Sequence, residues 1–163
     1  MKLPLAFVLV AASIAAHAGL PSSDQNFVTT AGQGGLAEVA LGKLASQQGA
    51  SAAVKSFGKQ MVADHSKGNA GLEAAAGKAG ASVPSAPSED QQATLTRFKG
   101  LQGTEFDKAY ADAMVKDHKS TIELFEKEAA KGDDGPIKTF ASTTLPTLKH
   151  HLQMAEHLQK QTK

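Results

Sequence analysis

Four side chains able to bind a metal interrupt rows of apolar residues spaced three or four apart, the pattern of amphipathic helices. Imidazole and carboxylate groups bind zinc, copper, nickel and iron, and the residue types alone do not select among these metals. Each residue alone also has a structural explanation, as a core histidine bonded to a carbonyl or a glutamate paired with it. Because each buried polar group costs free energy, four together favour a site for a transition metal or small ligand. They are Glu38, His65, His118 and His151.

Further donors lie near this set. Glu126 is the best placed additional carboxylate, although it follows His118 by about two helical turns. Asp64 and Asp117 directly precede two of the histidines, so they point about a quarter turn away and either orient neighbouring ligands or are solvated.

Methionines also accompany two of the histidines. Met61 precedes His65, and Met114 precedes His118, by four residues, so each pair stacks on one helix face. Methionine with histidine suits copper(I), but methionine is also an ordinary filler of helical cores.

The elements that position these residues are helices. Alanine is abundant, aromatic residues are scarce, and the apolar spacing predicts an all-α fold. We expect long helices at 24–48, 52–78 and 104–131, and a fourth from Pro136 to near the C-terminus, with a short helix in the long connection at 80–103.

Capping residues support these bounds. Ser23 and Ser51 are expected N-caps, and Ser88 with Gln91 three residues later forms a capping-box pattern for the short helix. Pro146 is expected to kink or break the last helix.

The rise of about 1.5 Å per residue places the four polar residues at similar heights. Glu38 lies roughly 15 Å and His65 roughly 20 Å from the turn that joins the first two long helices. His118 and His151 lie roughly 20 and 22 Å from the turn that joins the last two. All four are therefore predicted to converge near the middle of the bundle.

Two sequence patterns have competing explanations. G-Q-G-G-L-A at 32–37 matches a dinucleotide-binding fingerprint, but no strand precedes it, so close helix packing is the better interpretation. A second pattern is an internal repeat, which either duplication of a helical unit or a shared packing problem explains. In it, Phe57, Met61, Val62, Asp64, His65, Glu73 and Lys78 recur as Tyr110, Met114, Val115, Asp117, His118, Glu126 and Lys131.

The N-terminus is typical of an export signal. Lys2, the apolar stretch 3–16 and A-H-A at 16–18 predict a signal peptide at 1–18, cleaved near Ala18, and a single domain at 19–163 in the periplasm or outside the cell. The apolar stretch is too short for a membrane span, and none is expected in the mature chain. The chain has no cysteine, and its 17 basic and 16 acidic residues are interleaved, which argues against nucleic acid as a partner.

Seven stretches together resemble one family. They are Phe27, G-L-A-E-V-A-L-G at 35–42, M-V-A-D-H at 61–65, F-D-K-A-Y at 106–110, M-V-K-D-H at 114–118, L-F-E at 124–126 and L-P-T-L-K-H-H-L at 145–152. The chain thereby resembles an exported bacterial family of unknown function in the ferritin-like superfamily, whose members are labelled outer-membrane or secreted proteins. The resemblance implies a ferritin-like four-helix bundle with a long crossover carrying a short extra helix. It also matches Glu38, His65, His118 and His151, and favours His151 over His150.

The resemblance raises the question of di-iron chemistry. Di-iron bundles take Glu-x-x-His pairs from two helices, but Val62 and Val115 stand three residues before His65 and His118. Iron oxidation or storage at a dinuclear centre is therefore disfavoured. No cysteine or glycine-flanked serine supports a nucleophilic triad.

We therefore expect a periplasmic or secreted bundle that binds a transition metal or small ligand, for sensing, storage or stress protection in the envelope rather than for turnover. One alternative is a structural or interaction protein of the envelope without metal. A second is a dinuclear-metal redox enzyme. The sequence predicts no particular oligomeric state.

Overall fold

The computed structural model describes residues 20–163, so the predicted signal peptide lies outside the described residues. The described chain is all-α, as predicted, and the predicted bounds of the long helices agree with the observed ones to within two residues. The elements are α1 (Ser22–Gln48), α2 (Ala52–Lys78), α3 (Glu89–Lys99), α4 (Gly103–Lys131) and α5 (Gly135–Gln161).

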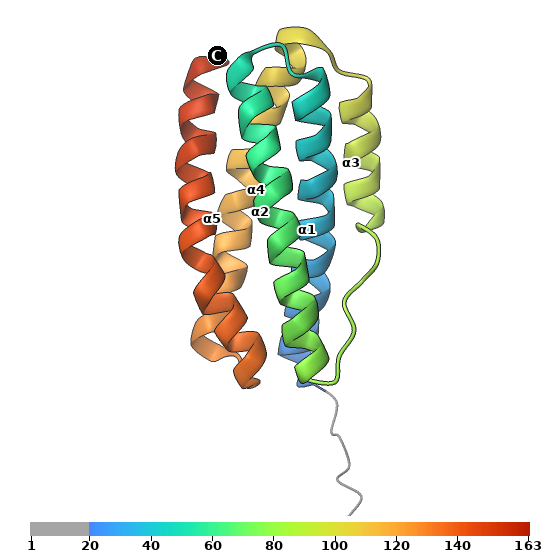
Figure 1. The fold of residues 1–163 in the computed structure, drawn as a ribbon, viewed down its shortest axis with the longest axis vertical. Helices are drawn as coiled ribbons and strands as arrows, with labels where there is room; N and C mark the ends of the chain where they lie inside the picture. The colour runs from blue at the N-terminus through green and yellow to red at the C-terminus, as the bar shows by residue number, and fades with distance from the viewer. Residues whose placement is uncertain (1–19) are drawn as a thin grey trace, which may run out of the picture.

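Four helices form the bundle and α3 lies outside it (Figure 1). The hairpins α1–α2 and α4–α5 are the closest pairs, α2 packs on α5, and α1 faces α4 across a looser contact. The connection from α2 to α4 returns along the length of the bundle and carries α3, which packs on α1. This is the predicted ferritin-like arrangement with a long crossover.

Capping explains most of the helix starts. Ser51 accepts a hydrogen bond from the backbone N–H of Val54, and Ser88 and Gln91 form the predicted capping box. The prediction for α1 was wrong, because α1 begins at Ser22 and Ser23 does not cap it. α5 continues through Pro146 without a break, and it bends toward its N-terminal end in Figure 1.

The hydrophobic core is divided into two clusters along the bundle axis. One lies toward the α1–α2 turn and includes Phe57, Met61 and Tyr110. The other lies toward the α4–α5 turn and includes Phe27 and Phe125. Along α2, α4 and α5, each histidine lies between the residues that belong to one cluster and those that belong to the other. The polar site therefore occupies a layer between two apolar ones.

Corresponding positions of the two hairpins are separated by a constant number of residues in the sequence. Ala52–Lys78 and Gly135–Gln161 are displaced by the same 83 residues. The same spacing relates Asp24 to Asp107, and both carboxylates are buried. Each accepts hydrogen bonds from backbone N–H groups in the turn of the opposite hairpin. The fold therefore has an approximate twofold relation that pairs α1 with α4 and α2 with α5.

The internal repeat seen in the sequence does not follow this relation. It pairs α2 with α4, which lie diagonally across the bundle and run in the same direction. His65 and His118 therefore reach the same level from two parallel helices. A shared packing problem explains the repeat better than duplication does.

The glycine-rich segment at 32–37 lies inside α1, as the packing interpretation requires. A Cβ atom at Gly32 would approach Val83 to 2.5 Å, and one at Gly35 would overlap the amide of Asn69. At Gly34, by contrast, nothing lies within 4 Å of an added Cβ. Close packing therefore accounts for two of these glycines and leaves Gly34 unexplained.

Candidate metal centre

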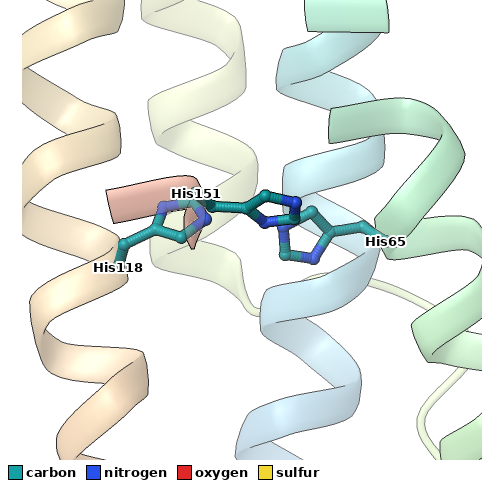
Figure 2. Close-up of side chains that lie close together, drawn as sticks. All are labelled: His65, His118 and His151. Atoms are coloured by element: carbon teal, nitrogen blue, oxygen red, sulfur yellow. The ribbon is translucent and has the colours of Figure 1, made fainter. Parts of the chain in front are cut away.

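Three histidines from three helices meet in the centre of the bundle (Figure 2). They are His65 of α2, His118 of α4 and His151 of α5, and each ring centroid lies 5.4–5.7 Å from the other two. One ligand nitrogen of each ring lies within 4.8 Å of those of the other two. His118 and His151 are each 1% exposed. The structure therefore brings these three residues together at one level of the bundle, as helical spacing predicted.

Hydrogen bonds fix the tautomers of two rings and leave one nitrogen of each free. His118 Nδ1 lies 2.9 Å from the carbonyl oxygen of Met114, so it carries the proton and donates. His151 Nε2 donates to Asp64 Oδ2 at 2.8 Å. The opposite nitrogens, His118 Nε2 and His151 Nδ1, are buried and have no hydrogen-bond partner, and the same holds for His65 Nε2. Three ring nitrogens, one from each histidine, are therefore buried without hydrogen-bond partners.

Burial keeps all three histidines neutral. Desolvation, with repulsion from the other two imidazoles, lowers the pKa of His65 to about 3. Desolvation and the neighbouring His151 lower the pKa of His118 to about 4. Burial also lowers the pKa of His151, although the hydrogen bond to Asp64 opposes the change. Neutral imidazole is the form that binds metal ions.

This donor set fits one transition-metal ion. Zinc–nitrogen bonds are about 2.0–2.1 Å long, which places two nitrogens of a tetrahedral site about 3.3 Å apart. Ligand nitrogens that lie within 4.8 Å of one another therefore need to approach by at most about 1.5 Å to share one ion. Three neutral imidazoles that leave one coordination position of the metal open suit zinc, copper(II) or nickel. Among the described residues, the cluster contains no carboxylate that bridges to a second ion, so the arrangement fits a mononuclear site better than a dinuclear one.

Glu38 of α1 lies beside the histidines rather than among them. Its Oε1 is 4.0 Å from His118 Nδ1, the nitrogen that already donates to Met114, and its Oε2 has no hydrogen-bond partner. Burial, reinforced by the nearby Asp117, raises the pKa of Glu38 to about 8. The carboxyl is therefore protonated at neutral pH and is a neighbour of the cluster rather than one of its ligand groups.

Glu126 is not brought to the cluster. Its side chain is half exposed, and its Oε1 lies 2.7 Å from Nζ of Lys149. His150 is exposed, whereas His151 is buried in the cluster, in agreement with the family pattern. Only the three histidines therefore remain as candidate ligands among the predicted site residues.

The two aspartates that precede histidines have different surroundings. Asp64 holds His151, and although burial alone raises its pKa, the hydrogen bonds from His151 and Gln60 lower the pKa of this carboxyl overall. Asp117 is half-buried near Glu38, and burial raises its pKa. The sequence left both roles open, because the identity of the partner depends on which helices are neighbours.

A groove of about 820 Å³ runs beside the cluster between α1 and α4, and α3 borders it. His65 and Glu38 both line it, whereas His118 and His151 do not. Sequence reasoning missed this groove, because it depends on the loose contact between α1 and α4 rather than on any motif. It connects the candidate metal centre with the outside through His65.

The fold and site together define a helical bundle with a long crossover and a buried cluster of three histidines. The chain belongs to the family described as a domain of unknown function, DUF4142, whose model matches residues 9–158. No curated protein matches the chain. In the described residues, no helix is both long and apolar enough to cross a membrane.

One solved structure shares the fold. It is the crystal structure of a DUF305 fragment from Deinococcus radiodurans, with a TM-score of 0.75 and 12% sequence identity. The match covers 88% of this chain and 99% of that one. At this identity, the likeness supports the all-α bundle and carries no information about function.

Proposed function

We propose that this protein binds one transition-metal ion through His65, His118 and His151. The observation that carries the proposal is that each histidine of this cluster has one buried ring nitrogen without a hydrogen-bond partner, and that one ligand nitrogen of each ring lies within 4.8 Å of the others. An unsatisfied buried polar atom costs about 1–3 kcal/mol, and a metal ion bound by all three rings removes this cost at each. Zinc, copper and nickel suit the donor set, and iron is a further candidate.

The surroundings of the cluster support the same proposal. Metal-bound histidines in proteins commonly donate their other ring N–H to a carboxylate or backbone carbonyl, which orients the ring and fixes the tautomer. His151 donates to Asp64 and His118 to the carbonyl of Met114. The low pKa values of the histidines keep the ligands deprotonated well below pH 7.

We further propose that the protein is exported and that its metal serves storage, sensing or stress protection in the envelope rather than turnover. The export proposal rests on the basic and apolar residues at 1–18. The proposal of a non-catalytic role rests on the missing Glu-x-x-His pairs of di-iron bundles, because Val62 and Val115 stand three residues before His65 and His118. Cell fractionation, with the protein found in the periplasm or medium, tests the first point; a cytoplasmic protein with an intact N-terminus would contradict it.

Metal titration of chelator-treated protein tests the binding proposal. We expect one equivalent of zinc, copper(II) or nickel to bind in isothermal titration calorimetry and to raise the melting temperature. His118→Gln should weaken binding by at least about 100-fold and keep the helical circular dichroism spectrum. His150→Gln, which alters an exposed histidine on α5, is the matched control and should bind as the parent does.

Two results would overturn the binding proposal. One is native protein that contains no metal and shows no change in melting temperature with any of these ions. The other is equal affinity in the parent and His118→Gln, because binding would then take place at surface groups such as His157.

A further inference from the structure

The groove between α1 and α4 has two chemically different halves. Along α4, the lining residues before Asp117 are mostly charged and include Glu105, Lys108 and Asp112, whereas the lining residues Leu124 and Phe125 follow it. The apolar half is completed by Leu72 of α2 and by Phe140 and Leu148 of α5. The volume of the whole groove, about 820 Å³, lies within the range of about 300–1,000 Å³ that is usual for small-molecule sites.

Two glycines in this wall have no packing explanation. Gly34 of α1 and Gly68 of α2 both line the groove, and nothing lies within 4 Å of a Cβ added at either position. Each lies inside a helix, where glycine in place of alanine costs about 1 kcal/mol. Their lack of side chains keeps the groove wide.

Two carboxyl groups meet the groove where its halves join, and the nearby Lys116 acts on Asp117 without forming an ion pair with it. Glu38 is 8% exposed, lines the groove, and has an Oε2 atom without a hydrogen-bond partner. Asp117 lines the groove next to it. Among the described residues, no lysine or arginine forms an ion pair with either carboxyl. A buried carboxyl of this kind requires either a proton or a cation.

We propose that the groove binds an amphiphilic amine, a small molecule with an apolar body and one cationic nitrogen. The body lies along Leu124, Phe125 and Phe140, and the ammonium group lies at Glu38 and Asp117. An ammonium ion donates hydrogen bonds to oxygens of both carboxyl groups and compensates the negative charge at this place. A carboxylate head would add negative charge beside these carboxyl groups, and an alcohol head would compensate none of it.

This inference does not depend on the proposed metal. The groove and both carboxyls belong to the metal-free protein, so chelator-treated protein is the correct sample. A protein that binds the amine but no metal would contradict only the proposed function, and a protein that binds metal but no amine would contradict only this inference.

Calorimetric titration with three molecules of equal chain length tests the choice of head group. Octylamine, octan-1-ol and octanoate are titrated separately into chelator-treated protein at pH 7. We expect octylamine to bind about tenfold more tightly than octan-1-ol, and octanoate to bind more weakly than either. Equal or tighter binding of octan-1-ol or octanoate would overturn the assignment of a cationic ligand.

Matched variants test the location. Gly34→Leu places an apolar side chain in the groove, at a position where nothing lies within 4 Å of an added Cβ, and it should weaken binding of octylamine by about tenfold or more. Gly77→Leu, at an equally open glycine outside the groove, should not. Asp117→Asn should reduce the preference for octylamine over octan-1-ol, and Glu123→Gln, at an exposed carboxylate on the same helix, should leave it unchanged. Unchanged octylamine binding in Gly34→Leu, with a normal melting curve, would place the ligand elsewhere and overturn the proposal.

Discussion

At the scale of single residues, the buried histidines use their two nitrogens differently. In His118 and His151, one nitrogen donates to Met114 or Asp64, and the other is buried without a hydrogen-bond partner. A core of leucines at these positions would avoid the burial of three unpartnered ring nitrogens, which costs about 1–3 kcal/mol each. The arrangement is therefore unfavourable in the metal-free protein and becomes favourable when an ion satisfies the three nitrogens.

Asp64 should control the affinity of the proposed site although it is not a ligand. We expect Asp64→Asn to weaken metal binding about 10–100-fold, because His151 loses the carboxylate that holds its Nε2 proton. Calorimetric titration measures the affinity, and ¹⁵N NMR of the histidine ring reports the tautomer. Asp112→Asn, at an exposed aspartate of α4, is the control. Unchanged affinity and tautomer in Asp64→Asn would show that the hydrogen bond has no role in the site.

Glu38 should make the metal-free protein less stable as the pH rises. Its pKa is about 8 in the folded state and 4.5 in the unfolded state, so between these values the folded protein holds the extra proton. The free energy of unfolding therefore contains a contribution that is full below pH 4.5 and is lost as the pH rises through 8. Glu38→Gln removes this dependence.

Urea unfolding in chelator at pH 5 and pH 7.5 measures the effect. Relative to the parent, Glu38→Gln should gain on the order of 3 kcal/mol between these two pH values. His65, whose lowered pKa makes stability increase with pH, is present in both proteins and cancels in the difference. A constant difference between parent and variant at both pH values would mean that Glu38 titrates normally.

The residues of the site were predictable from sequence only as far as helical spacing allows. Helical spacing predicts the height of each histidine along the bundle, but it does not predict where a side chain points or how a helix tilts. Glu38 therefore lies at the predicted height but outside the cluster. Glu126 lies eight residues beyond His118, about 12 Å along the axis, and pairs with Lys149 at the surface. The bond between Asp64 and His151 depends on α2 and α5 being neighbours, which no local pattern encodes.

At the scale of elements, two aspartates lock the hairpins together. Asp24, near the start of α1, accepts from the backbone N–H groups of Asp133 and Asp134, at 3.2 and 2.7 Å. Asp107, near the start of α4, accepts from those of Ala50 and Ser51, both at 2.8 Å. Each contact fixes the turn of one hairpin against the first helix of the other, and the two lie at opposite ends of the bundle.

Removal of these contacts should destabilise the fold strongly and additively. Asp24→Ala and Asp107→Ala each remove a buried carboxylate that accepts two N–H groups, and we expect each to cost about 2–3 kcal/mol. Because the sites lie at opposite ends, the double variant should lose the sum of the two. Urea unfolding measures these values, and Asp112→Ala, which alters an exposed aspartate, should change stability by less than about 0.5 kcal/mol. Losses as small as that of the control would show that water replaces the carboxylates.

The helices themselves were largely predictable, because their signals are local. Apolar spacing, the Ser51 cap and the capping box at Ser88 and Gln91 act within a few residues. Ser23 was wrongly assigned as a cap. The neighbouring Asp24 accepts a hydrogen bond from the backbone of Asp134 in the α4–α5 turn, and this contact joins residues more than a hundred positions apart in the sequence. The loose contact between α1 and α4, which creates the groove, likewise depends on tertiary packing.

At the scale of the whole molecule, the proposed metal joins the two hairpins. His65 belongs to the first hairpin, and His118 and His151 belong to the second. The only covalent connection between the hairpins is the crossover, in which Ser85 and Ala86 are exposed. An ion at the cluster therefore acts as a second link between the two halves, placed between the two clusters of the core.

Cutting the crossover should make this link measurable. A protease site inserted between Ser85 and Ala86 gives one fragment with α1 and α2 and another with α3, α4 and α5. The two aspartate contacts and both core clusters join residues of one fragment to residues of the other, so we expect the fragments to stay associated. Metal at 100 times its dissociation constant should strengthen the association by about 2.7 kcal/mol, or about 100-fold. Urea-dependent separation on size exclusion measures the gain, and His65→Leu in the first fragment should abolish it. A metal-independent association in the unsubstituted fragments would mean that the ion does not bridge the hairpins.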